Sequence, residues 1–377
     1  MTVSLPTAMR TEIGQQPAAL RATLDALLPS AAAAAGQLAA GCRQVLFIAR
    51  GTSDNAAVYG SYLLQAHAGM LATLGSPSIA TEYRSRLDLS GVLAVALSQS
   101  GQTEEIVETL AWARNCGART LAITNRAGSA LAEVADLALV TLAGTEHAVP
   151  ATKTFTTQLA ALAVLAIGLG ADLDPGQLRA VPDEIEAILA TGLDDELDPI
   201  VTELAGGVRL GAERRSGGSG GSPPLAGGAG GTGVAGAAVS GRGMAYAAAL
   251  ELALKLKEAC YLHAMGLSWA DLLHGPIAVV DPETPAILLA ADSGPALPGT
   301  IELARRVVAA GARAYAIGGG PGLAAASSRA VPGLPLPEWL APFGLIVPGQ
   351  LLTEALSRRL GIDPDSPRGL SKITQTG

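Results

Sequence analysis

A buried strand, a polar turn and the start of a helix follow one another in LAVALSQSGQTEEI, residues 93–106. The run LAVAL is apolar throughout, which is typical of a strand buried on both faces of a parallel sheet. The turn that follows consists of hydroxyl and amide side chains around one glycine. Such a turn before a helix indicates an anion-binding loop, because a helix N-terminus offers unpaired N–H groups and a partial positive charge.

Strands and helices alternate on either side of this stretch. In the first half, apolar runs predict strands at 44–49, 93–97, 120–124 and 137–142, with another apolar segment near 70–74. Helical patterns cover residues 11–40 and the segments between the strands, the last at 152–169. The second half repeats the theme, with strands expected at 234–240, 286–291 and 314–319 and helices ending near 260, 311 and 360. Alternation of this kind predicts an α/β fold with parallel sheets covered by helices on both faces.

The chain length and the glycine-rich segment predict how the domains are organised. The 377 residues are enough for two domains. We expect a helical segment, two α/β domains and a tail, with limits at 1–40, 41–195, 196–362 and 363–377. The segment SGGSGGSPPLAGGAGGTG, residues 216–233, is interpreted as a flexible loop of the second domain or a plain linker. The acidic stretch DDELDP, near 194–199, could equally be the joint between the domains.

Composition and charge exclude several classes of function. The formal charge of −8 argues against a general nucleic-acid or acidic-membrane surface. No signal core or membrane-length apolar run is found, and the cysteines Cys42, Cys116 and Cys260 are too widely spaced for a disulfide framework, so we expect a cytoplasmic protein. The four histidines show no metal-ligand spacing. Neither a metal nor an organic cofactor is expected.

Two turns of the first half share the same design. Gly51-Thr52-Ser53 follows the first strand, and the turn of residues 98–103 follows the third. If the sheet has the order 2-1-3-4-5, strands 1 and 3 are neighbours, and ligands bind outside their carboxyl ends. The alternative is that these hydroxyls only cap helices. A capping role suffices for one such turn, but two turns after these strands favour a shared anion. Neither a Walker loop nor a dinucleotide fingerprint is present.

Seven separated motifs carry a family resemblance. In chain order they are ARGTSDNA, LSQSGQTEE, ITNRAGSALAEVAD, AGTEHAVPATKTFTTQL, ALKLKEACYLHA, LLHGPIAVVD and DSPRGLSKITQTG. They resemble the tandem sugar isomerase (SIS) domains of glucosamine-6-phosphate synthases, from about residue 11 to the C-terminus. The resemblance implies two SIS domains, each a flavodoxin-like parallel sheet with helices on both faces.

The family's glutaminase domain has no counterpart here. That domain uses an N-terminal cysteine, whereas this chain has Thr2 and no cysteine before Cys42. We therefore expect that the chain does not obtain ammonia from glutamine by itself, although a separate glutaminase subunit could supply it.

The resemblance assigns roles to the polar turns and to the helix near residue 255. It implies that the substrate phosphate is held by Thr52, Ser53, Ser98, Gln99, Ser100 and Thr103. On a helix, Glu251, Lys255 and Glu258 share one side, which on spacing alone would be a solvated, salt-bridged face. In the family, the residue matching Glu258 moves the proton between C1 and C2, and the one matching Lys255 stabilises the developing enediolate.

Two further residues receive roles through the resemblance alone. His274 would open the sugar ring from a neighbouring subunit, which implies at least a homodimer with a shared active site; a lone histidine is otherwise more often structural. Lys372 lies in a polar tail that would ordinarily be considered frayed. The resemblance implies that this tail covers the site and that Lys372 forms a Schiff base with the keto sugar.

The leading functional hypothesis is an amino-sugar-phosphate isomerase that converts glucosamine 6-phosphate to fructose 6-phosphate and ammonia. One alternative is synthesis in the reverse direction from free ammonia or a partner's ammonia. A second is a deglycase for another amine-linked sugar phosphate, such as a fructosamine phosphate, since Met265 and Leu273 depart from the synthase pattern. A third is a sugar-phosphate sensor, but a sensor would not need Glu258, His274 and Lys372.

Overall fold

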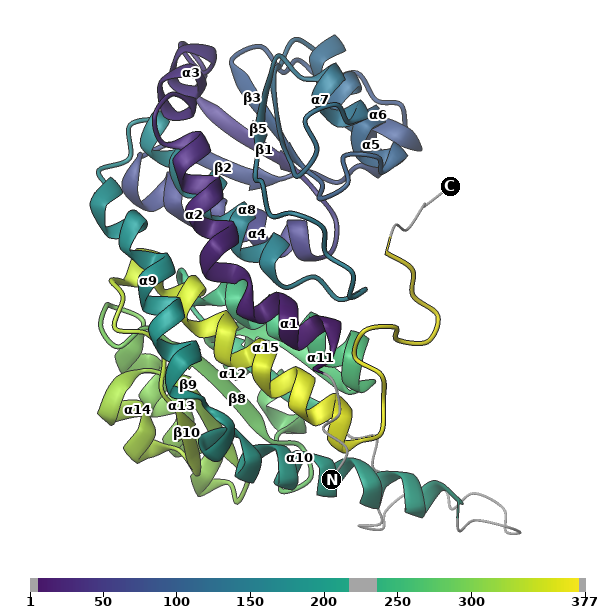
Figure 1. The fold of residues 1–377 in the computed structure, drawn as a ribbon, viewed down its shortest axis with the longest axis vertical. Helices are drawn as coiled ribbons and strands as arrows, with labels where there is room; N and C mark the ends of the chain where they lie inside the picture. Colours follow the sequence, from purple (N-terminus) through teal and green to yellow (C-terminus); the bar gives the residue numbers. More distant parts are fainter. Residues whose placement is uncertain (1–5, 217–235, 373–377) are drawn as a thin grey trace.

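Two five-stranded parallel sheets lie one above the other in the computed structural model, which describes residues 6–216 and 236–372 (Figure 1). The strands of the first sheet are β1 (Gln44–Ile48), β2 (Leu71–Leu74), β3 (Val92–Leu97), β4 (Arg119–Thr124) and β5 (Leu137–Val140). Those of the second sheet are β6 (Gly236–Gly241), β7 (His263–Ser268), β8 (Ala286–Ala290), β9 (Ala314–Gly318) and β10 (Arg329–Val331).

Helices connect and cover the strands. Those before β6 are α1 (Ala8–Gly14), α2 (Gln16–Leu27), α3 (Ala31–Leu38), α4 (Thr52–His67), α5 (Ser78–Thr81), α6 (Glu104–Asn115), α7 (Ala130–Val134), α8 (Lys153–Gly168), α9 (Pro175–Thr191) and α10 (Asp194–Ser216). Those after it are α11 (Ala245–Cys260), α12 (Trp269–Leu273), α13 (Leu297–Ala309), α14 (Gly320–Ala326) and α15 (Ala341–Arg359), with short 3-10 helices at Pro276–Val279 and Glu338–Leu340.

The first sheet has the order β2-β1-β3-β4-β5, which is the order assumed in the argument for a shared anion. The second has the order β10-β9-β8-β6-β7, which is the same connection pattern read from the other edge. In the first sheet β1 and β3 are paired in parallel, with Ile48 beside Ala96 near their carboxyl ends. The turns that follow these strands therefore leave the sheet side by side, at the point where ligands bind in folds of this kind.

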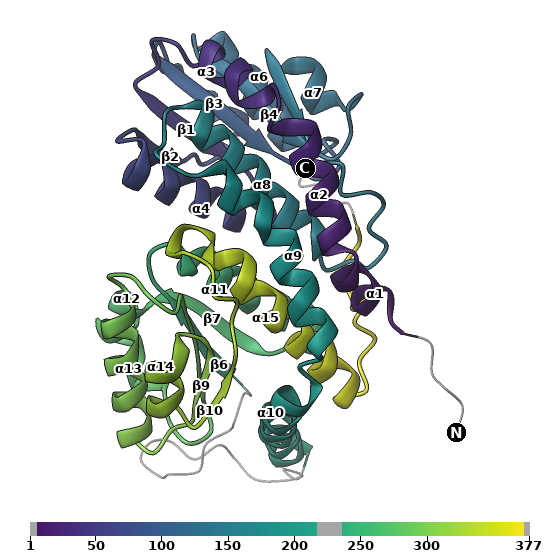
Figure 2. The same ribbon diagram turned by 60° about the vertical axis from the view of Figure 1, so that its left-hand side comes forward.

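Both faces of the central strands β3, β8 and β9 are buried, which explains their apolar runs. In β3, Leu93 and Val95 belong to the core beneath α4 and α8, whereas Ala94 and Ala96 face the core beneath α6 and α7. The first of these cores continues without a break into the second half, where it lies under α11 and α15. Helix α4 packs against α11, so the two sheets are joined through a helical layer (Figures 1 and 2).

The N-terminal helices and the C-terminal tail span both halves. Helix α1 lies along α15, and α2 packs on α8 and α9 (Figure 1). After α15 the tail runs back toward the first sheet (Figure 1). It is fastened where the Asp365 carboxylate accepts the backbone N–H groups of Ala8 and Met9, each at 2.7 Å, and where the Asp365 carbonyl accepts the N–H of Val149 at 2.9 Å. The tail is thus held in place rather than frayed up to residue 372.

Several elements differ from the prediction. Strand β7 was not predicted, because its sequence HAMGLS lacks an apolar run. Helix α9 was not predicted either, and it forms although Pro182 lies inside it. The expected domain limit at residue 195 falls in the first turn of α10, so DDELDP lies at the start of a helix. The glycine-rich segment 216–233 lies outside the described residues except for Ser216, the last residue of α10.

One stretch of the described residues, Glu338–Arg359, is long and apolar enough to cross a membrane by length and composition. It consists of the second 3-10 helix and α15, and 94% of its apolar window is buried inside the protein. Burial of this extent is typical of a core helix, because a membrane span would present apolar side chains to lipid.

Close packing of α3 on α8 gives a test of this core. A Cβ atom at Gly168 would lie 2.3 Å from the carbonyl oxygen of Ala32, which is backbone and has little room to move. We expect Gly168→Ala to lower the free energy of unfolding by roughly 1–3 kcal/mol, since overpacking forces the two helices apart. Urea unfolding followed by circular dichroism measures the change. Gly14→Ala, at a helical position with no atom within 4 Å, is the matched control; equal stability of the two variants would contradict the close contact.

Candidate active site

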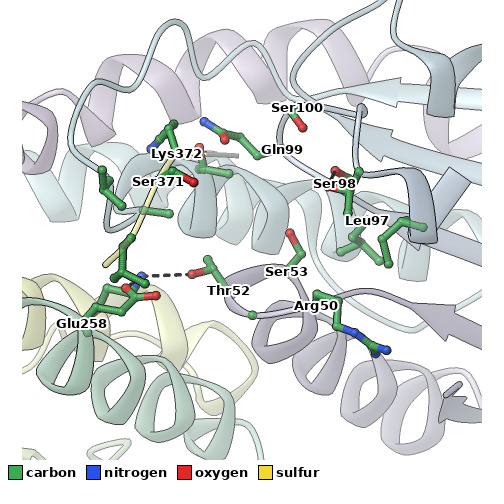
Figure 3. A pocket seen from close by; sticks show the side chains of 18 residues that line it. Arg50, Thr52, Ser53, Leu97, Ser98, Gln99, Ser100, Glu258, Ser371 and Lys372 are labelled. Carbon is green, nitrogen blue, oxygen red and sulfur yellow. Dashed lines mark hydrogen bonds and ion pairs between the residues drawn. The ribbon is translucent and has the colours of Figure 1, made fainter. Parts of the chain in front are cut away.

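A cleft of about 330 Å³ opens at the carboxyl ends of β1 and β3 (Figure 3). It is lined by all six residues that were expected to hold a phosphate and by three of the four expected catalytic residues: Thr52, Ser53, Ser98, Gln99, Ser100, Thr103, Lys255, Glu258 and Lys372. These residues come from the first half, from α11 of the second half and from the C-terminal tail. One chain therefore brings together residues that lie up to 320 positions apart in the sequence. Figure 3 shows the two most distant of them, Thr52 and Lys372, at the same cleft.

The first polar turn begins helix α4. Gly51, in the left-handed region with φ of 57°, turns the chain from β1 into this helix. The Ser53 hydroxyl accepts a hydrogen bond from the Gln158 amide at 2.9 Å, so its own hydrogen remains available for a ligand. The Thr52 hydroxyl instead donates to a Glu251 carboxylate oxygen at 2.9 Å. Thr52 lines the cleft, but its side chain serves first to connect α4 to α11.

The second polar turn has a fixed backbone shape. Gly101 adopts φ of 63°, and a Cβ there would lie 2.2 Å from the Ser129 hydroxyl oxygen, so only glycine fits. The Ser98 hydroxyl accepts the N–H of Gly101 at 3.2 Å, and the Ser100 hydroxyl accepts the N–H of Gln102 at 3.2 Å. These local bonds arrange the turn before any ligand binds.

The helix-capping alternative finds no support at either turn. The N-cap of helix α4 is Gly51, which has no side chain to cap with, and the side chain of Thr103 at the N-cap of helix α6 makes no capping hydrogen bond. By contrast, Thr7 and Ser129 do cap α1 and α7. The hydroxyls of both turns line the cleft instead, an arrangement suited to a bound anion such as a phosphate.

Three charged residues of α11 form a chain of ion pairs. Lys255 lies between Glu251, at 3.4 Å, and Glu258, at 2.5 Å. Glu251 and Lys255 are almost wholly buried, whereas the side chain of Glu258 is 22% exposed to the cleft. Sequence spacing alone suggested a solvated face, which is wrong for Glu251 and Lys255.

Burial and pairing shift the pKa values in this chain of charges. Burial raises the pKa of Glu251 above its ordinary value, although Lys255 and the Asn55 amide at 2.8 Å oppose the rise. Burial by itself would lower the pKa of Lys255, but the charges of Glu251 and Glu258 outweigh it and raise that pKa. Lys255 is therefore a permanent ammonium beside the exposed carboxylate of Glu258.

The tail crosses the cleft at Lys372. Its ammonium group bonds to a Glu146 carboxylate oxygen at 3.0 Å and to the Ala148 carbonyl at 2.6 Å. Glu146 and Ala148 belong to the loop between β5 and α8, whose next residue, Val149, also lines the cleft. Lys372 lines the cleft, as expected for a tail that reaches this site.

His274 is not among the residues that line this cleft. It follows α12 beside the second sheet, where it is exposed and where its backbone N–H closes the end of that helix. Its expected part in ring opening would need the corresponding residue of a second subunit.

Three residues near the cleft were missed by the sequence analysis. Arg50 lines its edge and pairs with Glu105 at 2.9 Å, Asn55 binds Glu251, and Glu146 binds Lys372. Arg50 and Asn55 flank the Thr52-Ser53 turn in ARGTSDNA, and Glu146 is the one acidic residue of AGTEHAVPATKTFTTQL. A charged or amide residue inside such a motif was the available signal. No group of three or more potential metal ligands occurs among the described residues.

The second sheet has an equivalent crevice of about 10 Å³. Its turns contain Gly243 and Gly294, and the Glu338 carboxylate lies against both. Burial raises the pKa of Glu338. The crevice of the second sheet is therefore filled by a side chain of the protein, whereas the cleft of the first sheet has a volume of about 330 Å³.

Removal of the central cation should expose its structural role. Lys255→Met leaves Glu251 buried without its counter-charge, and we expect a loss of roughly 3–5 kcal/mol in the free energy of unfolding. The loss of unfolding free energy should shrink as the pH falls toward the raised pKa of Glu251, because a neutral carboxyl tolerates burial. The full loss should return as the pH rises above that pKa. Denaturant unfolding at several pH values measures both effects. The control is Lys257→Met, at an exposed position of the same helix; similar losses in the two variants would refute the buried pair.

Comparison with known proteins agrees with these features. A model of the SIS domain family matches residues 39–168 and 237–329, one stretch in each half. Glutamine–fructose-6-phosphate aminotransferases [isomerizing] from Thermococcus kodakarensis and Symbiobacterium thermophilum are 32% and 34% identical over 97% of the chain. The chain spans 58% of the length of each of these relatives.

Solved structures show the same architecture. The C-terminal domain of glucosamine-fructose-6-phosphate aminotransferase from Francisella tularensis is 26% identical, with a TM-score of 0.74 over 97% of this chain and 100% of that one. Glucosamine-6-phosphate deaminase from Thermotoga maritima shares the fold at 20% identity, with a TM-score of 0.70 over 98% of this chain and 100% of that one. The chain therefore belongs to the SIS domain family and is related, over nearly its whole length, to the isomerase part of glutamine–fructose-6-phosphate aminotransferases.

Proposed function

We propose that this protein is an amino-sugar-phosphate isomerase that converts glucosamine 6-phosphate and water to fructose 6-phosphate and ammonia. The observation that carries the proposal is the position of Glu258, whose partly exposed carboxylate opens into the same cleft as the two anion-type turns. A phosphate on those turns would fix one end of a sugar, and the carboxylate would be available at the other end. The relationship to aminotransferases that isomerise fructose 6-phosphate supports the same substrate class.

Once the sugar ring is open, the groups of the cleft suffice for the proton transfer. Ring opening gives an aldehyde at C1 next to the amine-bearing C2. The Glu258 carboxylate then takes the proton from C2 and returns it to C1. In the same step the C1 oxygen gains a proton and the C2 amine loses one, which leaves an imine at C2. Water adds to C2 and ammonia departs, so that the ketose remains. The Lys255 ammonium, 2.5 Å from Glu258, would stabilise the negative charge that develops on the C1 oxygen during the proton transfer.

Ring opening is assigned to His274 of a second subunit. The exposure of His274 and its position outside the cleft of its own chain support a homodimer in which two chains complete each site. We further propose that the enzyme works in the cytoplasm, in keeping with a phosphorylated sugar as substrate.

The direct test is turnover of glucosamine 6-phosphate by wild-type protein and by Glu258→Gln. We expect release of ammonia and fructose 6-phosphate, and a loss of roughly 10²–10⁴-fold in kcat for the variant, because the amide cannot accept the C2 proton. Coupled assays of both products measure it, with exposed Lys257→Gln on the same helix as control.

The outcomes separate the alternatives. Normal turnover by Glu258→Gln would overturn the assignment of the base. Formation of glucosamine 6-phosphate from fructose 6-phosphate and ammonia, without the deamination, would favour the synthetic direction. Binding of sugar phosphates without turnover of glucosamine 6-phosphate would favour another amine-linked sugar phosphate or a sensor.

A mixing experiment tests the shared site. Glu258→Gln and His274→Ala should each be inactive alone, yet a hybrid dimer holds one site with both native residues. After unfolding and refolding together, we expect recovery of about a quarter of the wild-type activity, since half the dimers are hybrids with one active site each. If hybrid dimers form but recover no activity, His274 does not act across the interface. Each variant refolded alone is the control.

A further inference from the structure

We propose that Glu146 is a positioning residue that holds the ammonium group of Lys372 over the cleft and connects it to the phosphate-type turn. The proposal deepens the function proposed above and rests on it for the role of the cleft. Glu146 lies in the loop between β5 and α8, Lys372 lies in the tail, and the turn belongs to β3 and α6. Three segments that are distant in sequence therefore meet at one carboxylate.

The Glu146 carboxylate is held in place by contacts that do not involve Lys372. Its side chain is fully buried. One oxygen accepts the backbone N–H groups of Thr152 and Thr154, at 2.9 and 3.1 Å, and the other accepts the Thr154 hydroxyl at 2.8 Å. A carboxylate with this many donors cannot turn or retreat without leaving buried groups unpaired. The Glu146 carboxylate is therefore a rigid acceptor for the Lys372 ammonium.

The charge of Glu146 is also fixed. Burial alone would raise its pKa, but the Lys372 charge and the backbone N–H groups of Thr152 and Thr154 outweigh burial and lower that pKa. The carboxylate thus stays ionised at neutral pH in the described structure. A buried negative charge requires a cation, and Lys372 pairs with this carboxylate at 3.0 Å.

The same oxygen atom connects the tail to the phosphate-type turn. Glu146 Oε2 accepts the Lys372 ammonium at 3.0 Å and faces the Gln99 amide nitrogen at 3.4 Å. Gln99 and Lys372 lie close together above the cleft (Figure 3). An anion that reorients Gln99 would therefore alter the pairing of Lys372, so that occupation of the turn and closure of the tail are linked through Glu146.

Two contacts restrain the amine of Lys372 in the described tail. Its ammonium group donates to the Glu146 carboxylate and to the Ala148 carbonyl. With the tail closed as described, Lys372 acts as a hydrogen-bond donor and a positive charge at the rim. Attack of its amine on a carbonyl would first require its release from Glu146.

Chemical labelling of amines tests the proposal without any substrate. The chain has four lysines: Lys153, Lys255, Lys257 and Lys372. Lys257 is exposed and serves as an internal reference, whereas Lys372 is restrained by Glu146. We expect Glu146→Gln to speed acetylation of Lys372 about tenfold relative to Lys257, as read by peptide mass spectrometry, because an amide does not hold an ammonium as a carboxylate does.

Glu12→Gln is the matched control. Glu12 is a second buried carboxylate that accepts the backbone N–H of Ala148 in the same loop, at 3.2 Å, but it has no contact with Lys372. Its variant should leave the Lys372 labelling rate at the wild-type value. An unchanged rate in Glu146→Gln, or an equal increase in both variants, would overturn the proposal. If Glu146→Gln does not fold, Glu146→Asp keeps the charge on a shorter side chain and should give a smaller increase; an unchanged rate there would equally overturn it.

Turnover provides the second readout. Glu146→Gln should lower kcat about tenfold in the native background and change it little in a Lys372→Met background, because a positioning residue acts only through its partner. Equal losses in both backgrounds would show a general structural effect and contradict the proposal. The labelling result stands whether or not glucosamine 6-phosphate is the substrate, so failure of the proposed reaction and failure of this inference are distinguishable.

Discussion

The buried pairing of Glu251 with Lys255 is the constraint on which the site depends. Both side chains are almost wholly removed from water, and such charges are tolerated only when every partner is in place. Two of those partners, Thr52 and Asn55, belong to the first turn of α4. The pairing therefore sets α11 against the start of α4 and so fixes Glu258 relative to the first polar turn. An arrangement that separated the two halves would remove the hydrogen bonds that Thr52 and Asn55 donate to the Glu251 carboxylate.

The two halves share one topology but differ in chemistry. Both sheets have the same strand order, and both place two turns at the point where a ligand would bind. In the first half those turns carry hydroxyls around an open cleft, whereas in the second half Glu338 lies against the glycines of the turns. The second half supplies α11 instead, so it contributes the charged residues of the site rather than a site of its own. The two halves thus share a fold but contribute different residues to the site.

Carboxylates that accept backbone N–H groups assemble the remaining parts. Asp365 binds the start of α1, Glu12 binds the loop at Ala148, and Glu146 binds the same loop at Thr152. Each contact joins segments from opposite ends of the chain or stiffens the loop between them. Hydrogen bonds to charged acceptors are stronger than those between neutral groups, so a few of them suffice to hold an irregular tail and loop beside the cleft.

Local patterns in the sequence determined most of the strands and the polar turns. The run LAVAL, the turn at Ser98 and the positions of Thr52 and Ser53 follow from apolar runs and turn chemistry, which act over a few neighbouring residues. The irregular strand HAMGLS and the proline-containing α9 escaped prediction because contacts with the rest of the fold outweigh their weak local patterns. Only the tertiary structure decided that Glu251 is buried and that Glu146 meets Lys372. The burial and pairing of a charge depend on residues far apart in the chain, such as Thr52 and Glu251, which no short stretch of sequence records.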